Sequence, residues 1–354
     1  MIELFQKTQE GEKGSMSNSK FISVGENIHC TRIYKVGENF VKSLDDGSYV
    51  ITYNVNGEKR HLPIPTHFVE SEDWVKKKVK HVAVAIWQGV YGDPAGQEAG
   101  VSYLENMVLV QEANGASFLD LNVDEFSDDV EERVCLLQWA AGVIQHVASV
   151  PLSIDSSDLT ILRAGLEACD RSKGKPMVNS LSLERAAAIQ VASEAGAVVI
   201  AGASGETSMP STVEDRLRNY DKLLPKLVRA GFSYNDIYLD PLVFPAAVDV
   251  QNSKLALDSI RALREKYGPD IHFTPGISNV SYGLPKRKWV NLVFTYICIQ
   301  HGCDGGIVDP RHINTDLLAS LDTDSKAFLL TKALLMGEDE FATDFILAVR
   351  KGVI

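Results

Sequence analysis

The sequence predicts an α/β fold, and within that class a (β/α)8 TIM barrel. Seven segments share one layout, in which a short apolar run ends in acidic or amide side chains. The clearest are Ser153–Ser156, Met177–Ser180, Tyr238–Pro241 and Gly276–Asn279, and the others are Phe118–Asn122, Val24–Asn27 and Ile307–Pro310. An apolar run of this kind is typical of a buried parallel strand. Polar residues at its carboxyl end indicate an active site, because the strand ends of a barrel converge on one mouth.

The second observation is a regular alternation of helix-like and strand-like segments after Gly92. Apolar residues recur at helical spacing over 130–148, which predicts one amphipathic helix. We expect strands near 21–26, 117–122, 150–155, 175–179, 197–202, 236–240, 271–276 and 304–308, and further helices near 157–170, 182–195, 210–230, 250–267, 285–301 and 312–334. Eight such units are typical of the barrel. A doubly wound open sheet is the alternative, but it normally carries a glycine-rich turn after its first strand, and Gly25–Cys30 holds one glycine.

The amino-terminal part divides into a tail and an insertion. Residues 1–20 are polar and predict a flexible tail, and the barrel is expected over 21–354. An insertion over 30–92 follows the first strand, and Asp46-Gly47 and Asn56-Gly57 within it are hairpin turn signals. We expect a hairpin-containing cap beside the barrel mouth. The basic run at 76–80 predicts a solvated helix face, with a docking patch as the alternative.

Composition excludes several classes of function. The chain has 354 residues, a formal net charge of -12 and a pI near 5.2, which argues against nonspecific nucleic-acid binding and against docking on an anionic membrane. No run approaches the roughly 18–20 apolar residues of a membrane span. Five scattered cysteines without a Cys-x-x-Cys motif indicate reduced thiols in the cytoplasm. No metal site is expected, because Cys298, His301 and Cys303 lack a fourth ligand and a familiar spacing.

The polar strand ends are mostly Asp and Asn, which suits hydrogen bonding to a flat nitrogen heterocycle better than nucleophilic catalysis. The main candidates are Asp155, Asn179, Asp240 and Asn279. Each has an alternative interpretation as a helix cap or a turn residue. Weaker candidates are Glu26, Asn122 and Arg287, the last of which is alternatively a solvated charge.

The run Gly276–Ser281, followed by Arg287 and taken with Asp155-Ser156, Asn179-Ser180 and Asp240-Pro241, resembles the pterin-binding methyltransferases. This family includes the methyltetrahydrofolate:corrinoid/iron-sulfur protein methyltransferase, the folate domain of cobalamin-dependent methionine synthase and the methyltransferase components of demethylase systems. The resemblance implies a dihydropteroate synthase-like pterin-binding barrel. It implies transfer of a methyl group between N5 of tetrahydrofolate and the cobalt of a corrinoid protein, with no metal bound by the chain itself. A homodimer is also expected.

The resemblance implies that Asp155, Asn179 and Asp240 bind the pterin and that Asn279 lies near N5 as the catalytic residue. Glu26, Asn122 and Arg287 also match the family's pattern. The chemistry agrees, because a pterin edge carries N–H donors that suit carboxylate acceptors. An Asn that turns its carbonyl oxygen toward a positively charged N5 stabilises the transition state without acting as an acid.

Two departures from the family pattern and two alternatives remain. The family usually has Arg after the first Gly-Glu, where this chain has Asn27, and the insertion over 30–92 is additional. No Asp-x-His-x-x-Gly motif is present, so cobalamin is expected on a separate partner protein. Dihydropteroate synthase is one alternative, but the acidic loop 124–129 would repel the pyrophosphate of its substrate. A noncatalytic pterin-binding subunit is the other.

Overall fold

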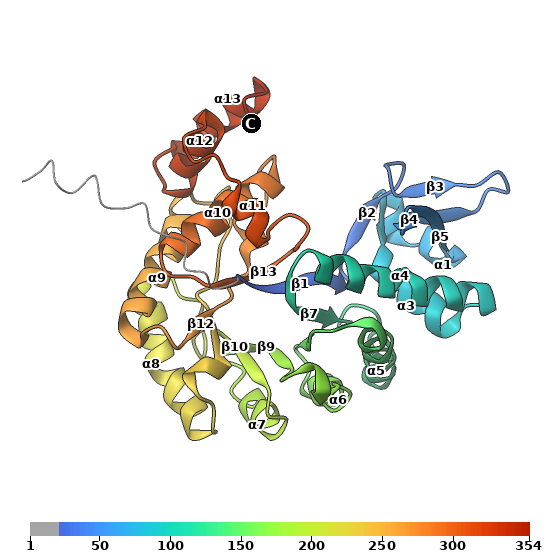
Figure 1. Ribbon diagram of the computed structural model, residues 1–354, viewed down its shortest axis with the longest axis horizontal. Helices are drawn as coiled ribbons and strands as arrows, with labels where there is room; N and C mark the ends of the chain where they lie inside the picture. The colour runs from blue at the N-terminus through green and yellow to red at the C-terminus, as the bar shows by residue number, and fades with distance from the viewer. Residues whose placement is uncertain (1–20) are drawn as a thin grey trace, which may run out of the picture.

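Eight parallel strands form the barrel in the computed structural model, which describes residues 21–354; the expected tail at 1–20 lies outside this range. The sheet order is β12-β11-β10-β9-β8-β7-β1-β13, and a parallel bridge between Gly276 and Ile307 joins the two edges. The strands are β1 (Ile22–His29), β7 (Ala116–Asn122), β8 (Leu152–Asp155), β9 (Met177–Leu181), β10 (Val198–Gly202), β11 (Ile237–Asp240), β12 (His272–Phe273) and β13 (Gly305–Val308). The predicted (β/α)8 barrel is confirmed (Figure 1).

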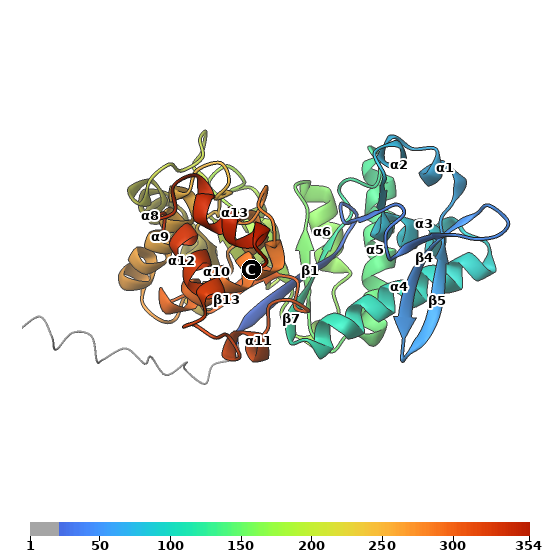
Figure 2. The same cartoon turned by 90° about the horizontal axis from the view of Figure 1, so that it is seen from above.

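Helices cover the outside of the barrel (Figures 1 and 2). They are α4 (Pro94–Ala113), α5 (Val130–Val147), α6 (Leu159–Glu167), α7 (Ala188–Glu194), α8 (Val213–Arg229), α9 (Gln251–Tyr267), α10 (Arg287–Gln300), α11 (Thr315–Ala319), α12 (Lys326–Leu335) and α13 (Thr343–Arg350). The single helix predicted over 312–334 is wrong, since the chain breaks between α11 and α12, where the Ser325 hydroxyl starts a new helix by accepting from Phe328 N–H. Within 21–354, none of the helices combines the length and the apolar composition needed to cross a bilayer.

The barrel interior is filled on its amino-terminal side. A separate apolar cluster packs there, formed by Val24, Phe118, Met177, Val198, Ile200 and Tyr238. The larger core lies between the strands and the surrounding helices. Because the interior below is packed with side chains, a ligand reaches the barrel from the carboxyl ends of the strands.

The segment after β1 folds as a small β-rich unit, which we call the insertion (residues 33–80). It contains β2 (Ile33–Lys35), β3 (Val41–Ser43), β4 (Tyr49–Val55), β5 (Glu58–Pro63), α1 (Thr66–Val69), α2 (Glu72–Val75) and β6 (Lys78–Lys80). Strands β3, β4 and β5 form an antiparallel sheet, and the two expected Asp-Gly and Asn-Gly turns lie between them. In Figures 1 and 2 the insertion stands to one side of the barrel, next to α4.

The insertion begins and ends at one point. Strands β2 and β6 pair with each other, and the His81 N–H donates to the Arg32 carbonyl at 3.1 Å. The next segment, α3 (His81–Tyr91), packs against α4 and α5. Residues 81–91 therefore belong to the helical layer around the barrel.

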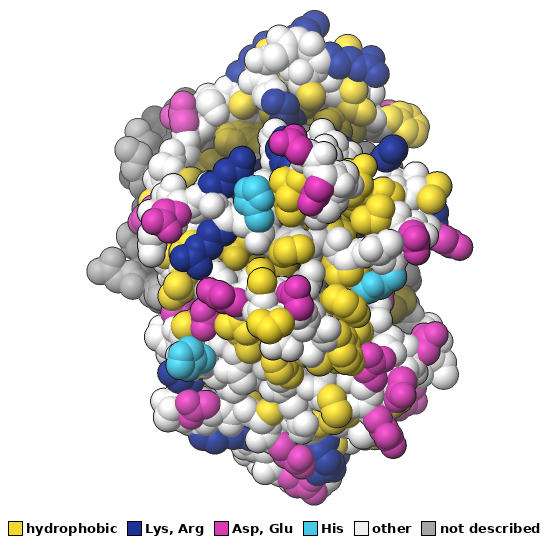
Figure 3. Space-filling view, turned by 90° about the vertical axis from the view of Figure 1, so that its right-hand side faces the viewer, with side chains coloured by type: hydrophobic (Ala, Val, Ile, Leu, Met, Phe, Trp, Pro, Cys, Tyr) yellow, Lys and Arg dark blue, Asp and Glu magenta, His cyan; other side chains and the backbone are white. Residues whose placement is uncertain are grey.

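The basic run does not lie on a helix face, contrary to the prediction. Lys78 and Lys80 belong to β6, and Lys76 follows α2. Lys80 pairs with Glu125 at 3.0 Å, which ties the insertion to the loop after β7. Figure 3 views the molecule from the insertion side, where apolar side chains gather across the middle of the face and acidic ones are frequent below.

Candidate active site

Five polar side chains meet at the carboxyl ends of β1, β7, β8 and β9. His29 Nε2 lies 2.7 Å from Asp120 Oδ2, and Asn179 Nδ2 donates to both oxygens of Asp120 at 3.3 and 3.2 Å. Asn122 Nδ2 donates to Asp155 Oδ2 at 3.0 Å. Asp120 is fully buried, so this carboxylate holds His29 and Asn179 in place from beneath the mouth.

These bonds fix what each amide presents to a ligand. The Asn179 nitrogen is used by Asp120, so its carbonyl oxygen is left to accept. Asn122 is satisfied at both ends, because its oxygen also accepts from the Asp124 N–H at 3.0 Å. Asn122 therefore orients Asp155, and direct binding of the pterin by Asn122 stays a prediction. The cap interpretation of Asp155 is wrong, because Asp158 is the cap of α6.

The charges of this cluster are perturbed. Burial and, to a smaller extent, the neighbouring Asp120 carboxylate raise the pKa of Asp155 to about 7, while His29 opposes the shift. Burial lowers the pKa of His29, but the hydrogen bond and charge of Asp120 outweigh it, and the net shift is upward. The cluster thus holds two groups whose pKa values lie above their ordinary range, the Asp155 carboxyl and the His29 imidazole.

Asp240 ends β11 and shapes the turn that follows. Its Oδ1 accepts from the Leu242 N–H at 2.9 Å, so the turn interpretation holds for one of its oxygens. Burial raises its pKa to about 6. The turn is held from below by Arg216, which is fully buried and donates to the carbonyls of Pro241 and Leu242.

Asn279 lies on the loop between β12 and α10, at the end of the short helix η3 (Ile277–Asn279). A Cβ placed on Gly276 would come within 3.0 Å of Asn279 Nδ2, so the side chain lies close over that glycine. The Asn279 side chain is exposed, and among residues 21–354 its amide has no hydrogen-bond partner. Arg287 does not project into the mouth; its guanidinium donates to Ser278 O at 2.8 Å and Ser281 Oγ at 3.0 Å, which braces this loop.

Glu26 links the end of β1 to the same loop. Its carboxylate pairs with Arg32 at 2.8 Å and accepts from Ser278 Oγ at 3.4 Å. Burial raises the pKa of Glu26, and Arg32 opposes that shift. The resemblance led us to expect Arg directly after Glu26, where this chain has Asn27. Arg32 supplies a guanidinium beside Glu26 instead.

Comparison with known proteins agrees with this geometry. The family model described as pterin binding enzyme matches residues 101–309, which is more than half of the chain. The chain belongs to the family of pterin-binding enzymes.

Two curated relatives of this pterin-binding enzyme are methyltransferases. A methylcorrinoid:tetrahydrofolate methyltransferase from Eubacterium limosum is 27% identical over 263 residues, covering 73% of this chain and 91% of that protein. A methionine synthase from Mycobacterium leprae is 29% identical over 218 residues, covering 57% of this chain and 18% of that protein. Among solved structures, a dihydropteroate synthase from Stenotrophomonas maltophilia is 20% identical and aligns with 64% of this chain and 87% of its own, with a TM-score of 0.48.

Two residues of the pterin-binding enzyme's mouth were missed from the sequence, His29 and Asp120. The signal for Asp120 was strand alternation: Asp120 lies two residues before Asn122, so both side chains lie on the same face of β7. His29 was missed because β1 was expected to end at Glu26, whereas it continues to His29, opposite Asn122.

A cation is one further occupant to consider. His29, Asp120 and Asp155 each offer a ligand atom, and these atoms lie within 4.8 Å of one another. However, the same atoms are engaged: His29 Nε2 with Asp120, Asp120 with Asn179, and Asp155 Oδ2 with Asn122. The absence of a bound metal therefore stays a prediction, and the hydrogen-bonded arrangement favours an organic ligand.

Proposed function

We propose that this pterin-binding enzyme transfers a methyl group between N5 of tetrahydrofolate and the cobalt of a corrinoid carried by a separate protein. The observation that carries the proposal is the Asn279 amide, which is unpaired within residues 21–354, on a loop at the same mouth as three acceptors, Asp155, Asn179 and Asp240. The relative from Eubacterium limosum, named for this pair of substrates, supports the reaction class.

The acceptors account for pterin binding. The amino group and ring N–H groups of a tetrahydropterin are donors, and the proposed acceptors are Asp155, Asn179 Oδ1 and the Asp240 carboxylate, which also accepts from the backbone of Leu242 and Gly276. Each hydrogen bond to a charged acceptor contributes about 1.5–3 kcal/mol. Asn122 and His29 act through Asp155 and Asp120, because they hold those carboxylates in position.

Asn279 is the proposed catalytic residue. Methyl transfer to or from N5 places positive charge on that nitrogen, and an amide oxygen turned toward N5 stabilises that charge in the transition state. Arg287 and Glu26 are positioning residues, because both bind the loop that carries Asn279. When bound at the mouth, the corrinoid cobalt supplies the atom that exchanges the methyl group with N5.

The mouth offers a surface for the protein that carries the corrinoid. Three large apolar side chains are exposed on loops that follow strands β10, β11 and β12: Met209 (64%), Val248 (79%) and Tyr282 (67%). These three side chains are the proposed contact points for the partner protein. A homodimer in the cytoplasm is part of the same proposal.

The test measures methyl transfer from methylcobalamin to tetrahydrofolate under anaerobic conditions. The visible absorption spectrum of the cobalt monitors the reaction. We expect slow transfer with free methylcobalamin and faster transfer with a methylated corrinoid protein, since the partner supplies orientation as well as cobalt. Normal tetrahydrofolate binding without transfer to or from any corrinoid would refute the proposal and favour a noncatalytic pterin-binding subunit.

A further inference from the structure

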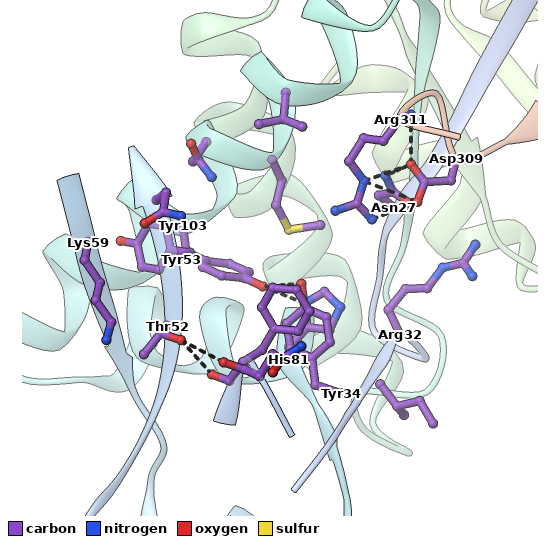
Figure 4. Close-up of a pocket in the computed structure, with 17 residues that line it drawn as sticks. Asn27, Arg32, Tyr34, Thr52, Tyr53, Lys59, His81, Tyr103, Asp309 and Arg311 are labelled. Atoms are coloured by element: carbon purple, nitrogen blue, oxygen red, sulfur yellow. Dashed lines mark hydrogen bonds and ion pairs between the residues drawn. The ribbon is translucent and has the colours of Figure 1, made fainter. Parts of the chain in front are cut away.

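A cavity of about 550 Å³ lies between the insertion, α4 and the loops that follow β1 and β13 (Figure 4). None of the proposed pterin-binding residues lines it. Its walls come from the insertion and from barrel elements, so it exists only because the insertion packs beside α4.

One wall of the cavity is aromatic. Tyr34 is stacked between Phe40, at a centroid distance of 4.5 Å, and His81, at 4.0 Å. Phe40 ends this stack and is 47% exposed. Tyr53 and Tyr103 meet edge to face at 4.9 Å in the same wall. The free face of an aromatic stack favours another flat ring.

The charged lining is basic, although the whole chain carries a net charge of -12. It holds Arg32, Lys59 and Arg311 against one carboxylate, Asp309. Asp309 pairs with Arg311 at 2.7 Å and accepts from Asn27 at 3.0 Å, and Arg32 pairs with Glu26 at 2.8 Å, so the charges of Asp309, Arg311 and Arg32 are balanced. Lys59 is exposed and has no ion pair within residues 21–354. The cavity therefore suits an aromatic ligand that carries negative charge.

The cavity and the barrel mouth share a wall. Arg32 lines the cavity and also binds Glu26, whose carboxylate accepts from Ser278, the neighbour of Asn279. Beside it, Asn27 joins the end of β1 to Asp309 at the end of β13. The cavity is therefore linked through Arg32 and Glu26 to the loop that carries Asn279.

From this placement we infer that the cavity receives the aminobenzoyl-glutamate tail of the folate substrate, an inference that rests on the proposed function. The tail leaves the pterin at C6, next to N5 and opposite the edge that carries the amino group. With that edge bound by Asp155 and Asn179 on β8 and β9, C6 faces the side of the barrel where β12, β13 and β1 are neighbours. The tail's benzamide ring matches the Phe40 stack, and its carboxylates match the free ammonium of Lys59.

The test compares the affinity of tetrahydrofolate with that of 6-methyltetrahydropterin, which lacks the tail, by anaerobic calorimetry. Lys59→Glu should weaken tetrahydrofolate binding roughly three- to tenfold, because a partly exposed ion pair is lost and replaced by repulsion. Phe40→Ala should weaken it about two- to tenfold through loss of ring stacking. Both variants should bind 6-methyltetrahydropterin as the wild type does. Lys42→Glu and Leu44→Ala are the matched controls, since both residues are exposed on the insertion outside the cavity.

The outcomes separate the inference from the proposed function. If both cavity variants bind tetrahydrofolate like the wild type, while 6-methyltetrahydropterin also binds, the tail lies elsewhere and the pterin site stands. An equal effect in the control variants would also overturn the inference, since it would reflect general charge or folding. If the wild type binds neither ligand, the proposed function fails and the inference with it. Circular dichroism establishes that each variant is folded.

Discussion

Pterin affinity should fall as the pH is lowered from 8 to 6, because the ionised Asp155 carboxylate is a stronger acceptor for the pterin N–H donors than the protonated carboxyl group. The pKa of this buried carboxyl is raised to about 7. In the free protein it is roughly nine-tenths ionised at pH 8 and roughly one-tenth ionised at pH 6. A ligand that binds the ionised form therefore loses about tenfold in affinity over this range. Asp240, with a pKa of about 6, is roughly half ionised at pH 6 and adds about a further twofold.

The expected total is roughly twentyfold, with the higher affinity at the higher pH. The sign follows from the upward shift: the free carboxyl holds a proton that the pterin's N–H donors displace, so binding releases protons. Calorimetry with 6-methyltetrahydropterin in buffers of different ionisation enthalpy measures both the affinity and the released protons. His29 lies in the same cluster, 2.7 Å from Asp120 and 4.0 Å from Asp155, and its charge opposes the upward shift of the Asp155 pKa.

Asp155→Asn is the control. The variant lacks the titrating group and keeps an oxygen that accepts from Asn122, so its affinity should be lower at pH 8 and should change only about twofold down to pH 6. Any titration of the ligand itself affects both proteins equally. Wild-type affinity that is flat or that rises as the pH falls would refute the reasoning, and an unchanged slope in Asp155→Asn would assign the effect to another group.

Four further substitutions test the site. Asn279→Ala should lower methyl transfer by about 10²–10³ with little change in tetrahydrofolate affinity, and equal losses in both would make it a plain binding residue. Asp240→Ala should weaken pterin binding by about 1.5–3 kcal/mol, and calorimetry at wild-type affinity would remove it from the pocket. Arg287→Ala should slow transfer by about tenfold to a hundredfold through a displaced Asn279 loop, measured as turnover against binding. Arg216→Met should lower the free energy of unfolding by about 2–5 kcal/mol in denaturant titration, because two buried carbonyls lose their donor; a smaller change would mean that the turn finds other donors.

Local patterns in the sequence were enough to predict the barrel and to place Asp155, Asn179 and Asp240 at strand ends. An apolar run with a polar end can be recognised without knowing which segments pack against it. The roles of Asn122 and Arg287 did not follow. Asn122 points to Asp155 and Asp124, and Arg287 points back to its own loop, and these choices depend on atomic packing.

The position of His29 depends on the pairing of β1 with β7, whose register shifts between Gly25 and Ile28. The cavity beside the mouth could not be predicted from local sequence patterns either. It arises where Tyr34 and Tyr53 of the insertion meet Tyr103 of α4, a contact between segments far apart in the sequence.

The pairing of β2 with β6, and the Arg32–His81 hydrogen bond beside it, have a thermodynamic consequence for the whole chain. Holding the two ends of a loop of nearly fifty residues together costs about 3 kcal/mol of chain entropy. Ile51 and Leu62 are fully buried within that loop, and each contributes about 1.5–3 kcal/mol on burial. The segment thus offsets its own closure. Because loop entropy grows only with the logarithm of length, lengthening the exposed turns between β3 and β4 or between β4 and β5 would hardly change the stability of the barrel.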